Sequence, residues 1–202
     1  MSKAKTAVLV SGGGTNLQAL IDAERAGKLP HVEFVSVIAS RPDAYALTRA
    51  ANAGIPGHVV CRKGSTQEAF EREILRLLEQ DGAQLIILAG FMSILSADFV
   101  GRYPRRILNV HPALLPAFGG KGFYGLHVHE AALARGVKVT GATVHYVNEI
   151  ADGGEILLQK AVDVLPGDTP ETLQRRVMEQ AEWLILPQAA EIAAREIVGA
   201  AP

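Results

Sequence analysis

Cysteine is almost absent from the 202-residue chain, in which Cys61 is the only one. A lone cysteine cannot form a disulfide within the chain, which is typical of proteins kept in a reducing compartment. Positive charge is not in excess either, because 20 lysines and arginines face 21 acidic residues and the formal net charge is −1. That balance argues against the basic surface on which nucleic-acid binding depends.

Long apolar runs are missing as well. No stretch approaches the ~20 apolar residues that cross a bilayer. The first six residues, Met1-Ser-Lys-Ala-Lys-Thr6, lead towards a strand and lack the apolar core of a secretory signal. We therefore expect a cytoplasmic protein, a monomer or homodimer, whose partners are small molecules rather than membranes or nucleic acids.

The chain does contain a regular alternation of short apolar runs and amphipathic stretches. This pattern is typical of a parallel sheet covered by helices. The apolar runs predict strands over 7–10, 33–39, 57–60, 84–88, 107–108, 139–147 and 156–164. The other stretches predict helices over 17–26, 42–53, 67–81, 96–102 and 126–134, and a last helix over 169–196 that is interrupted near Pro187.

No repeat, linker or low-complexity segment divides this pattern, so we expect a single domain over 1–202. The predicted fold class is α/β, with one doubly wound (Rossmann-like), mainly parallel sheet. A C-terminal antiparallel hairpin over 139–164 extends the sheet at one edge, and the final helix follows it.

A glycine-rich turn, Ser11-Gly-Gly-Gly-Thr-Asn-Leu-Gln18, follows the first predicted strand. Glycines leave the backbone N–H groups unobstructed, and a helix N-terminus favours an anion. The turn lacks the Gly-Lys-Ser/Thr of a P-loop, and Leu17 occupies the third glycine position of the dinucleotide motif. A small phosphate-bearing ligand is therefore predicted, with a ligand-free tight turn as the alternative. A valine in place of Gly14 is expected to obstruct the anion.

The strand at 107–108 leads into Asn109-Val-His-Pro-Ala-Leu-Leu-Pro116. Ligands of open α/β sheets bind beyond the carboxyl ends of the strands, and residues two apart on a strand share a side. Asn109 and His111 are therefore expected to face one spot. There an imidazole could transfer a proton near neutral pH, and an amide could donate to a developing oxyanion. The alternatives are a core histidine and a turn-stabilising amide.

Two further segments are candidates for the same site. Asp152-Gly-Gly154 lies in a loop that is long for a hairpin, and its carboxylate could reach His111, although Asp-Gly is also a common turn dipeptide. Met92, Ile94 and Leu95 could form a slot for a flat heterocycle, or only core. His127 and His129 do not share a face of their predicted helix and lack further ligands, so we predict no metal site.

Taken together, these motifs resemble one known family. The segment 109–116 with Asp152-Gly-Gly154 is similar to the formyltransferase superfamily that uses 10-formyltetrahydrofolate. The turn at 11–18 narrows the resemblance to members that formylate a ribonucleotide amine in purine synthesis. The resemblance spans residues 6–188. It implies formyl transfer from 10-formyltetrahydrofolate, without a metal. It also implies a phosphate-binding half over about 1–100 and a folate-binding and catalytic half over about 101–202.

The resemblance also implies a role for each matching residue. The catalytic residues would be Asn109, His111 and Asp152. The substrate-binding residues would be Gly13, Gly14, Thr15, Asn16, Pro112 and Glu182. The folate-binding residues would be Met92, Ser93, Ile94, Leu95, Asn109, Asn148, Glu149, Ile150, Ala151 and Asp152. The bond between Leu115 and Pro116 would be cis.

The chain departs from many of these relatives at Gln67 and Ser93, where they carry arginine. Its loop over 119–124 is also longer, and Lys121 there is a candidate phosphate contact. A related enzyme acting on methionyl-tRNA would be expected to carry a further C-terminal domain, and a related hydrolase an N-terminal one. A non-catalytic phosphate-binding module is the remaining alternative, but it would have no use for Asn109, His111 and Asp152 together.

Overall fold

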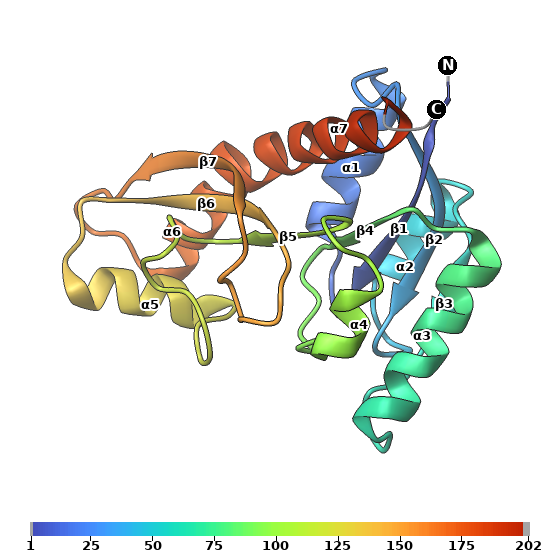
Figure 1. The fold of residues 1–202 in the computed structure, drawn as a ribbon. Coiled ribbons are helices and arrows are strands. Elements are labelled where there is room, and N and C mark those ends of the chain that lie inside the picture. The colour runs from blue at the N-terminus through green and yellow to red at the C-terminus, as the bar shows by residue number, and fades with distance from the viewer. Residues whose placement is uncertain (1, 200–202) are drawn as a thin grey trace.

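The computed structural model of the chain describes residues 2–199. Its strands form one sheet in the order β3-β2-β1-β4-β5-β6-β7 (Figure 1). They are β1 (Ala4–Val10), β2 (Val32–Ala39), β3 (Gly57–Val59), β4 (Leu85–Leu88), β5 (Ile107–His111), β6 (Val139–Tyr146) and β7 (Ile156–Asp163). Strands β1 to β5 pair in parallel, whereas β6 and β7 are antiparallel to their neighbours. The predicted mainly parallel sheet with an antiparallel hairpin is confirmed.

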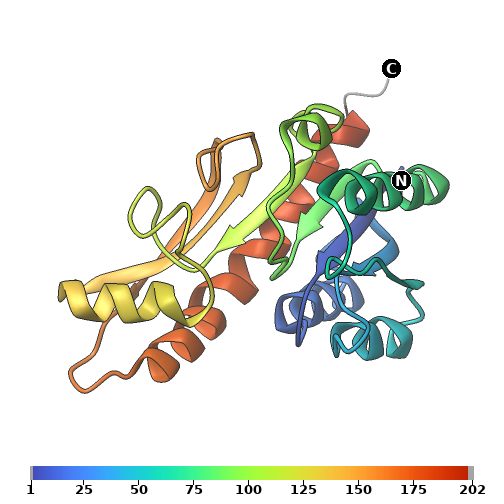
Figure 2. The same cartoon turned by 90° about the horizontal axis from the view of Figure 1, so that it is seen from below.

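Helices cover both faces of this sheet. They are α1 (Thr15–Arg25), α2 (Ala46–Asn52), α3 (Gln67–Asp81), α4 (Ala97–Gly101), α5 (Leu126–Arg135), α6 (Pro170–Val177), the π-helical segment η1 (Met178–Glu182) and α7 (Trp183–Gly199). Figures 1 and 2 show α7 running along one face, with α3 and α4 on the other side. Within residues 2–199, no helix combines the length and the hydropathy that a membrane span requires.

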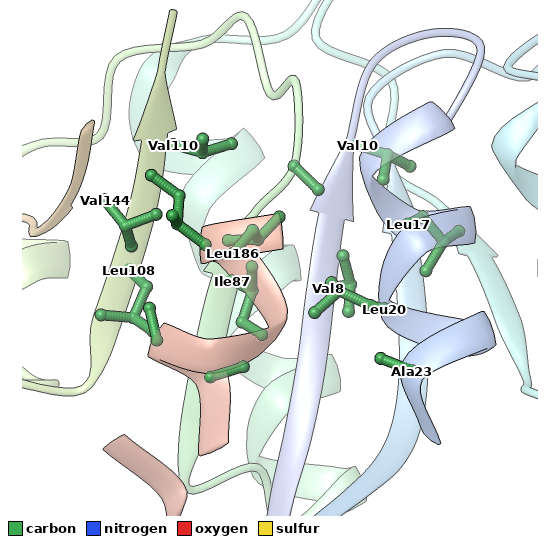
Figure 3. Packing of buried hydrophobic residues seen from close by; sticks show 14 of the residues in the cluster. Val8, Val10, Leu17, Leu20, Ala23, Ile87, Leu108, Val110, Val144 and Leu186 are labelled. Atoms are coloured by element: carbon green, nitrogen blue, oxygen red, sulfur yellow. The ribbon is translucent and has the colours of Figure 1, made fainter. Parts of the chain in front are cut away.

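The core has two layers because alternate residues of a strand point to opposite faces. Val8 and Val10 of β1 face the cluster that includes Leu17 of α1 and Leu186 of α7 (Figure 3). Ala7 and Leu9 of the same strand face the cluster built around α3 and α4. A central strand buried on both sides explains why its sequence is a continuous apolar run.

Threonine side chains cap the N-termini of two helices. The side chains of Thr66 and Thr169 accept hydrogen bonds from the N–H groups of Ala69 and Thr172. Pro170 occupies the first helical position, where no N–H is needed. These caps fix where α3 and α6 begin.

Two helix predictions were wrong in detail. The stretch 42–53 becomes helical only at Ala46, after Arg41 pairs with the carboxylate of Asp43 and the chain turns. The last helix is interrupted at η1, and Pro187 lies inside α7. A proline disturbs the turn before it, because its ring and missing N–H affect the carbonyl four residues earlier. The interruption therefore lies on the N-terminal side of Pro187.

Candidate active site

Three loops meet where β1, β4 and β5 end, and Ser11 joins the first two. Its N–H donates to the carbonyl of Gly90 over 3.1 Å, and its hydroxyl accepts from the N–H of Met92 over 2.9 Å. The glycine-rich turn over 11–14 is thus a neighbour of the loop over 89–96. Adjacent carboxyl ends of parallel strands are where open α/β sheets bind ligands.

Gly13 and Gly14 lie in different surroundings. Gly14 has a φ of +73°, and a Cβ there would lie 2.7 Å from the Cβ of Ala46 in α2. Only glycine suits such a position. A Cβ on Gly13 would meet no atom within 4 Å. The turn is therefore open at Gly13, and a valine at Gly14 would collide with α2 rather than obstruct a ligand.

Asn16, in the first turn of α1, connects the glycine-rich turn to the last helix. Its Nδ2 donates to Oε2 of Glu182 over 2.7 Å, and both side chains are buried. Burial raises the pKa of Glu182 to about 7, while the hydrogen bond from Asn16 acts in the opposite direction. A carboxyl that titrates near neutral pH is typical of functional sites. Glu182 ends η1, and π-helical turns are frequent at such sites.

The predicted catalytic residues come together around Asp152. Its Oδ1 lies 3.4 Å from Nδ2 of Asn109, and its Oδ2 lies 3.5 Å from Nδ1 of His111. Asn109 and His111 face this carboxylate from one side of β5, as their spacing predicted. Asp152 has a φ of +54°, which is uncommon for a residue other than glycine.

His145 of β6 is a fourth member of this group. Its Nε2 lies 3.6 Å from Oδ1 of Asp152 and 3.2 Å from Nδ2 of Asn109. Its Nδ1 lies 2.9 Å from the carbonyl of Tyr146, so this nitrogen carries a proton. Because β5 and β6 are antiparallel, Asn109 is paired directly with His145. The pairing of β5 with β6 thus brings His145 into the group.

The loop after β5 contacts two of these residues. Nε2 of His111 lies 2.7 Å from the carbonyl oxygen of Phe118, and the N–H of Gly120 donates to Oδ2 of Asp152 over 2.8 Å. A carbonyl oxygen only accepts, so Nε2 of His111 carries a proton. The bond between Leu115 and Pro116 at the start of this loop is cis, as the family resemblance implied.

Asp152 is held in its charged form. Burial acts to raise the pKa of this carboxyl. The close imidazole of His145, the hydrogen bond from Gly120 and the positive charge of the two imidazoles outweigh that effect, so the pKa lies below its ordinary value. The group therefore presents a carboxylate beside two imidazoles and an amide, an arrangement suited to acid–base chemistry and to stabilising an oxyanion.

A cavity of about 350 Å³ opens beside Asp152. Its lining includes every predicted folate-binding residue: Met92, Ser93, Ile94, Leu95, Asn109, Asn148, Glu149, Ile150, Ala151 and Asp152. Met92, Ile94 and Ile150 are more than half exposed, although they are large apolar side chains. Apolar walls with a few convergent polar groups are typical of small-molecule sites. This composition fits a flat heterocycle with polar edges.

Thr15 and Pro112 are two further predicted substrate-binding residues. Thr15 begins α1, and its hydroxyl lies 3.9 Å from the sulfur of Met178 in η1. Pro112 directly follows β5 and is half-buried. Lys121 lines the cavity rather than the glycine-rich turn, so its predicted contact with phosphate has no support from its position.

The two histidines of α5 have different surroundings. His127 is exposed and pairs with Glu130, whereas His129 is fully buried, and neither of its ring nitrogens has a partner. Burial, together with the charge of His111, lowers the pKa of His129 to about 4. Within residues 2–199, no group of three or more potential ligand side chains could hold a metal ion.

Comparisons with known proteins place this geometry in context. The formyl transferase family matches residues 4–189. Phosphoribosylglycinamide formyltransferases of Haemophilus influenzae and Escherichia coli are 42% and 40% identical to the chain. These matches cover 91% and 89% of the chain, and 84% and 82% of the two relatives. The trifunctional purine biosynthetic protein adenosine-3 of Bos taurus is 45% identical, but the chain spans only 18% of its length.

Solved structures agree with the sequence relatives. The crystal structure of glycinamide ribonucleotide transformylase 1 from Symbiobacterium toebii has a TM-score of 0.89 and 40% identity, covering 96% of this chain and 89% of that one. The phosphoribosylglycinamide formyltransferase from Brucella melitensis has a TM-score of 0.86 and 43% identity, covering 96% of each chain. The chain therefore belongs to the formyl transferase family and, within it, to the phosphoribosylglycinamide formyltransferases.

Proposed function

We propose that the chain transfers the formyl group of 10-formyltetrahydrofolate to the amine of phosphoribosylglycinamide in de novo purine synthesis. The observation that carries this proposal is the position of the Asp152 carboxylate. It lies 3.4 Å from Asn109, 3.5 Å from His111 and 3.6 Å from His145, on the wall of an apolar cavity. Formyl transfer needs such a combination of an oxyanion donor and a proton acceptor.

In the proposed reaction, the substrate amine attacks the formyl carbon, and the electron pair of the C=O bond moves to the oxygen. Nδ2 of Asn109 donates to this oxygen. The electron pair on the oxygen then re-forms the C=O bond as the bond from the formyl carbon to the folate nitrogen breaks. The electron pair of the broken bond stays on the folate nitrogen, which takes up the proton that the substrate nitrogen releases through water. The substrate nitrogen loses its extra proton to water oriented by Asp152.

His111 supports this step from its position beside Asp152, where its Nδ1 lies 3.5 Å from Oδ2 of the carboxylate. Its Nε2 donates to the carbonyl of Phe118 in the structure. His111 therefore reaches the formyl oxygen only when the oxygen replaces that carbonyl as the acceptor. Until then it acts through its contact with Asp152.

The two substrates occupy the two sides of the site. The phosphate lies at Gly13, Gly14, Thr15 and Asn16, where backbone N–H groups and the N-terminus of α1 favour an anion. Pro112 and Glu182 contact the rest of the ribonucleotide. The pterin lies among Met92, Ser93, Ile94 and Leu95, with the loop over 148–152 on its other side.

The wider setting also remains a proposal. We propose a cytoplasmic enzyme that acts as a monomer or homodimer on small molecules, without nucleic acid, membrane or metal. Residues 1–202 would form one domain, with the phosphate-binding half over about 1–100 and the folate-binding and catalytic half over about 101–202.

One assay tests the reaction. The purified chain is given 10-formyltetrahydrofolate with phosphoribosylglycinamide, methionyl-tRNA or water as the acceptor, and loss of the formyl folate is followed. We expect rapid transfer only to phosphoribosylglycinamide. Transfer to either other acceptor at a similar rate, or binding of phosphoribosylglycinamide without transfer, would overturn the proposal.

A further inference from the structure

We propose that Arg49 of α2 is a positioning residue that orients the backbone N–H groups of the glycine-rich turn towards the substrate phosphate. This inference rests on the proposed function. Nε of Arg49 donates to the carbonyl of Gly13 over 2.8 Å. The preceding carbonyl of the turn is bound by the same helix: the N–H of Ala46 donates to the carbonyl of Gly12 over 3.2 Å.

These two contacts determine which way the N–H groups point. A peptide unit is planar and trans, so its N–H points away from its C=O. Fixing the carbonyl of Gly12 towards α2 turns the N–H of Gly13 away from α2, and fixing the carbonyl of Gly13 does the same for the N–H of Gly14. Neither N–H donates to another residue of the described chain, so both are free to bind an anion.

Without such contacts the turn would have no fixed shape. Glycine loses more conformational freedom on folding than other residues, and a flexible turn would have to lose it on binding. A Cβ on Gly12 or Gly13 would meet nothing within 4 Å, so packing does not restrain these two residues. The contacts from α2 therefore provide the preorganisation.

Arg49 is itself held in place. Its NH1 donates to Oε1 of Gln18 in α1 over 2.9 Å, and its guanidinium lies 5.1 Å from the centre of the Tyr45 ring. The planar fork of arginine reaches the turn and α1 at once, which the single ammonium of a lysine cannot do. The charge of Arg49 also adds to the positive potential near the turn.

The test compares Arg49→Met and Arg49→Lys with wild type in steady-state kinetics. Hydrogen bonds to charged groups contribute about 1.5–3 kcal/mol, so we expect the KM for phosphoribosylglycinamide to rise by roughly tenfold or more in both variants. The KM for the formyl folate should stay within about twofold. The matched control is Arg25→Lys. Arg25 at the end of α1 donates to the carbonyl of Asn52 at the end of α2, so it also joins these two helices but not at the glycine-rich turn.

Two further measurements separate positioning from other roles. With the dephosphorylated substrate, ribosylglycinamide, wild type and both variants should have the same KM. If Arg49→Lys binds the phosphorylated substrate like wild type, charge alone is responsible and the proposal is overturned. An equal rise in KM for ribosylglycinamide would overturn it too, because the effect would not involve the phosphate.

Binding of inorganic phosphate provides a readout without catalysis. We expect titration calorimetry to show weaker phosphate binding to Arg49→Lys than to wild type, and unchanged melting temperature would show that the variant is folded. Unchanged phosphate affinity would overturn the role of Arg49. If wild type transferred no formyl group, the proposed function would fail, while the phosphate titration would still decide on Arg49.

Discussion

The side-chain amide of Asn16 donates to the buried carboxyl of Glu182 over 2.7 Å, although 166 positions separate the two residues in the chain. This contact joins the first turn of α1 to the end of η1. It places an ionisable group beside the glycine-rich turn, where burial raises its pKa to about 7. The free energy of unfolding should therefore depend on pH through Glu182, which lies in the proposed substrate site.

The first prediction concerns stability and pH. A carboxyl whose pKa rises from 4.5 in the unfolded chain to about 7 in the fold favours the folded state below pH 4.5. That contribution is lost as pH rises through 7, and the full change corresponds to roughly 3 kcal/mol. We expect Glu182→Gln to remove this decline, measured as the melting temperature between pH 5 and 8. The exposed Glu24→Gln is the control, and a slope unchanged by Glu182→Gln would contradict the assignment.

The second prediction concerns Asp152. Asparagine keeps the shape and can still accept from the N–H of Gly120, but it removes the charge beside His111 and His145. We expect Asp152→Asn to lower kcat by roughly 10², which is about 2.7 kcal/mol of transition-state stabilisation. The KM values should change little.

A control and a double variant make this prediction sharper. The surface substitution Asp163→Asn should leave kcat unchanged. His111→Asn should reduce kcat at least as much as Asp152→Asn, and combining the two should cost less than the sum because the residues act as a unit. If the folded Asp152→Asn enzyme had a normal kcat, the segment 152–154 would be a turn without a catalytic role.

The third prediction separates two neighbouring glycines. Gly13→Val places its side chain in open space at the turn, so the variant should fold and show a higher KM for phosphoribosylglycinamide. Gly14→Val would bring its Cβ to 2.7 Å from Ala46 and impose a φ of +73° on a branched residue. We expect it to lower the melting temperature instead. Equal melting temperatures for the two variants would contradict this distinction.

The fourth prediction concerns metal. The described residues contain no cluster of ligands, and no step of the proposed reaction needs one. Prolonged dialysis against EDTA should leave the rate of formyl transfer unchanged. Loss of activity that Zn²⁺ restored would show that a metal takes part.

Much of the fold could be predicted because local patterns and tertiary contacts agree. Leu85–Leu88 is an apolar run in sequence and a strand buried on both faces in the structure. The start of α2 could not be predicted, because it depends on a contact between Ala46 and Gly12 that links distant parts of the chain. The position of η1 was missed because no sequence pattern distinguishes a π-helical turn from its α-helical neighbours.

The site was predictable to a similar degree. The spacing of Asn109 and His111 indicated a shared side of β5, and the long loop made Asp152 a candidate for the same site. The resemblance added most of the folate-binding residues. The contacts of the Phe118 carbonyl and the Gly120 N–H were not predicted. Nearly all residues carry these backbone groups, so the residue type does not indicate which of them lie in the site. Arg49 was missed for another reason: its role depends on the packing of α2 against the turn.

The π-helical segment at 178–182 has a consequence for how the length of the protein can change in evolution. A π-helical turn holds about one residue more than an α-helical turn. Losing one residue there would restore regular α-helical geometry and leave the packing of α7 in place. Losing one inside α7 would rotate everything beyond it by about 100° and expose buried alanines such as Ala189. Insertions and deletions between related chains should therefore concentrate at this segment.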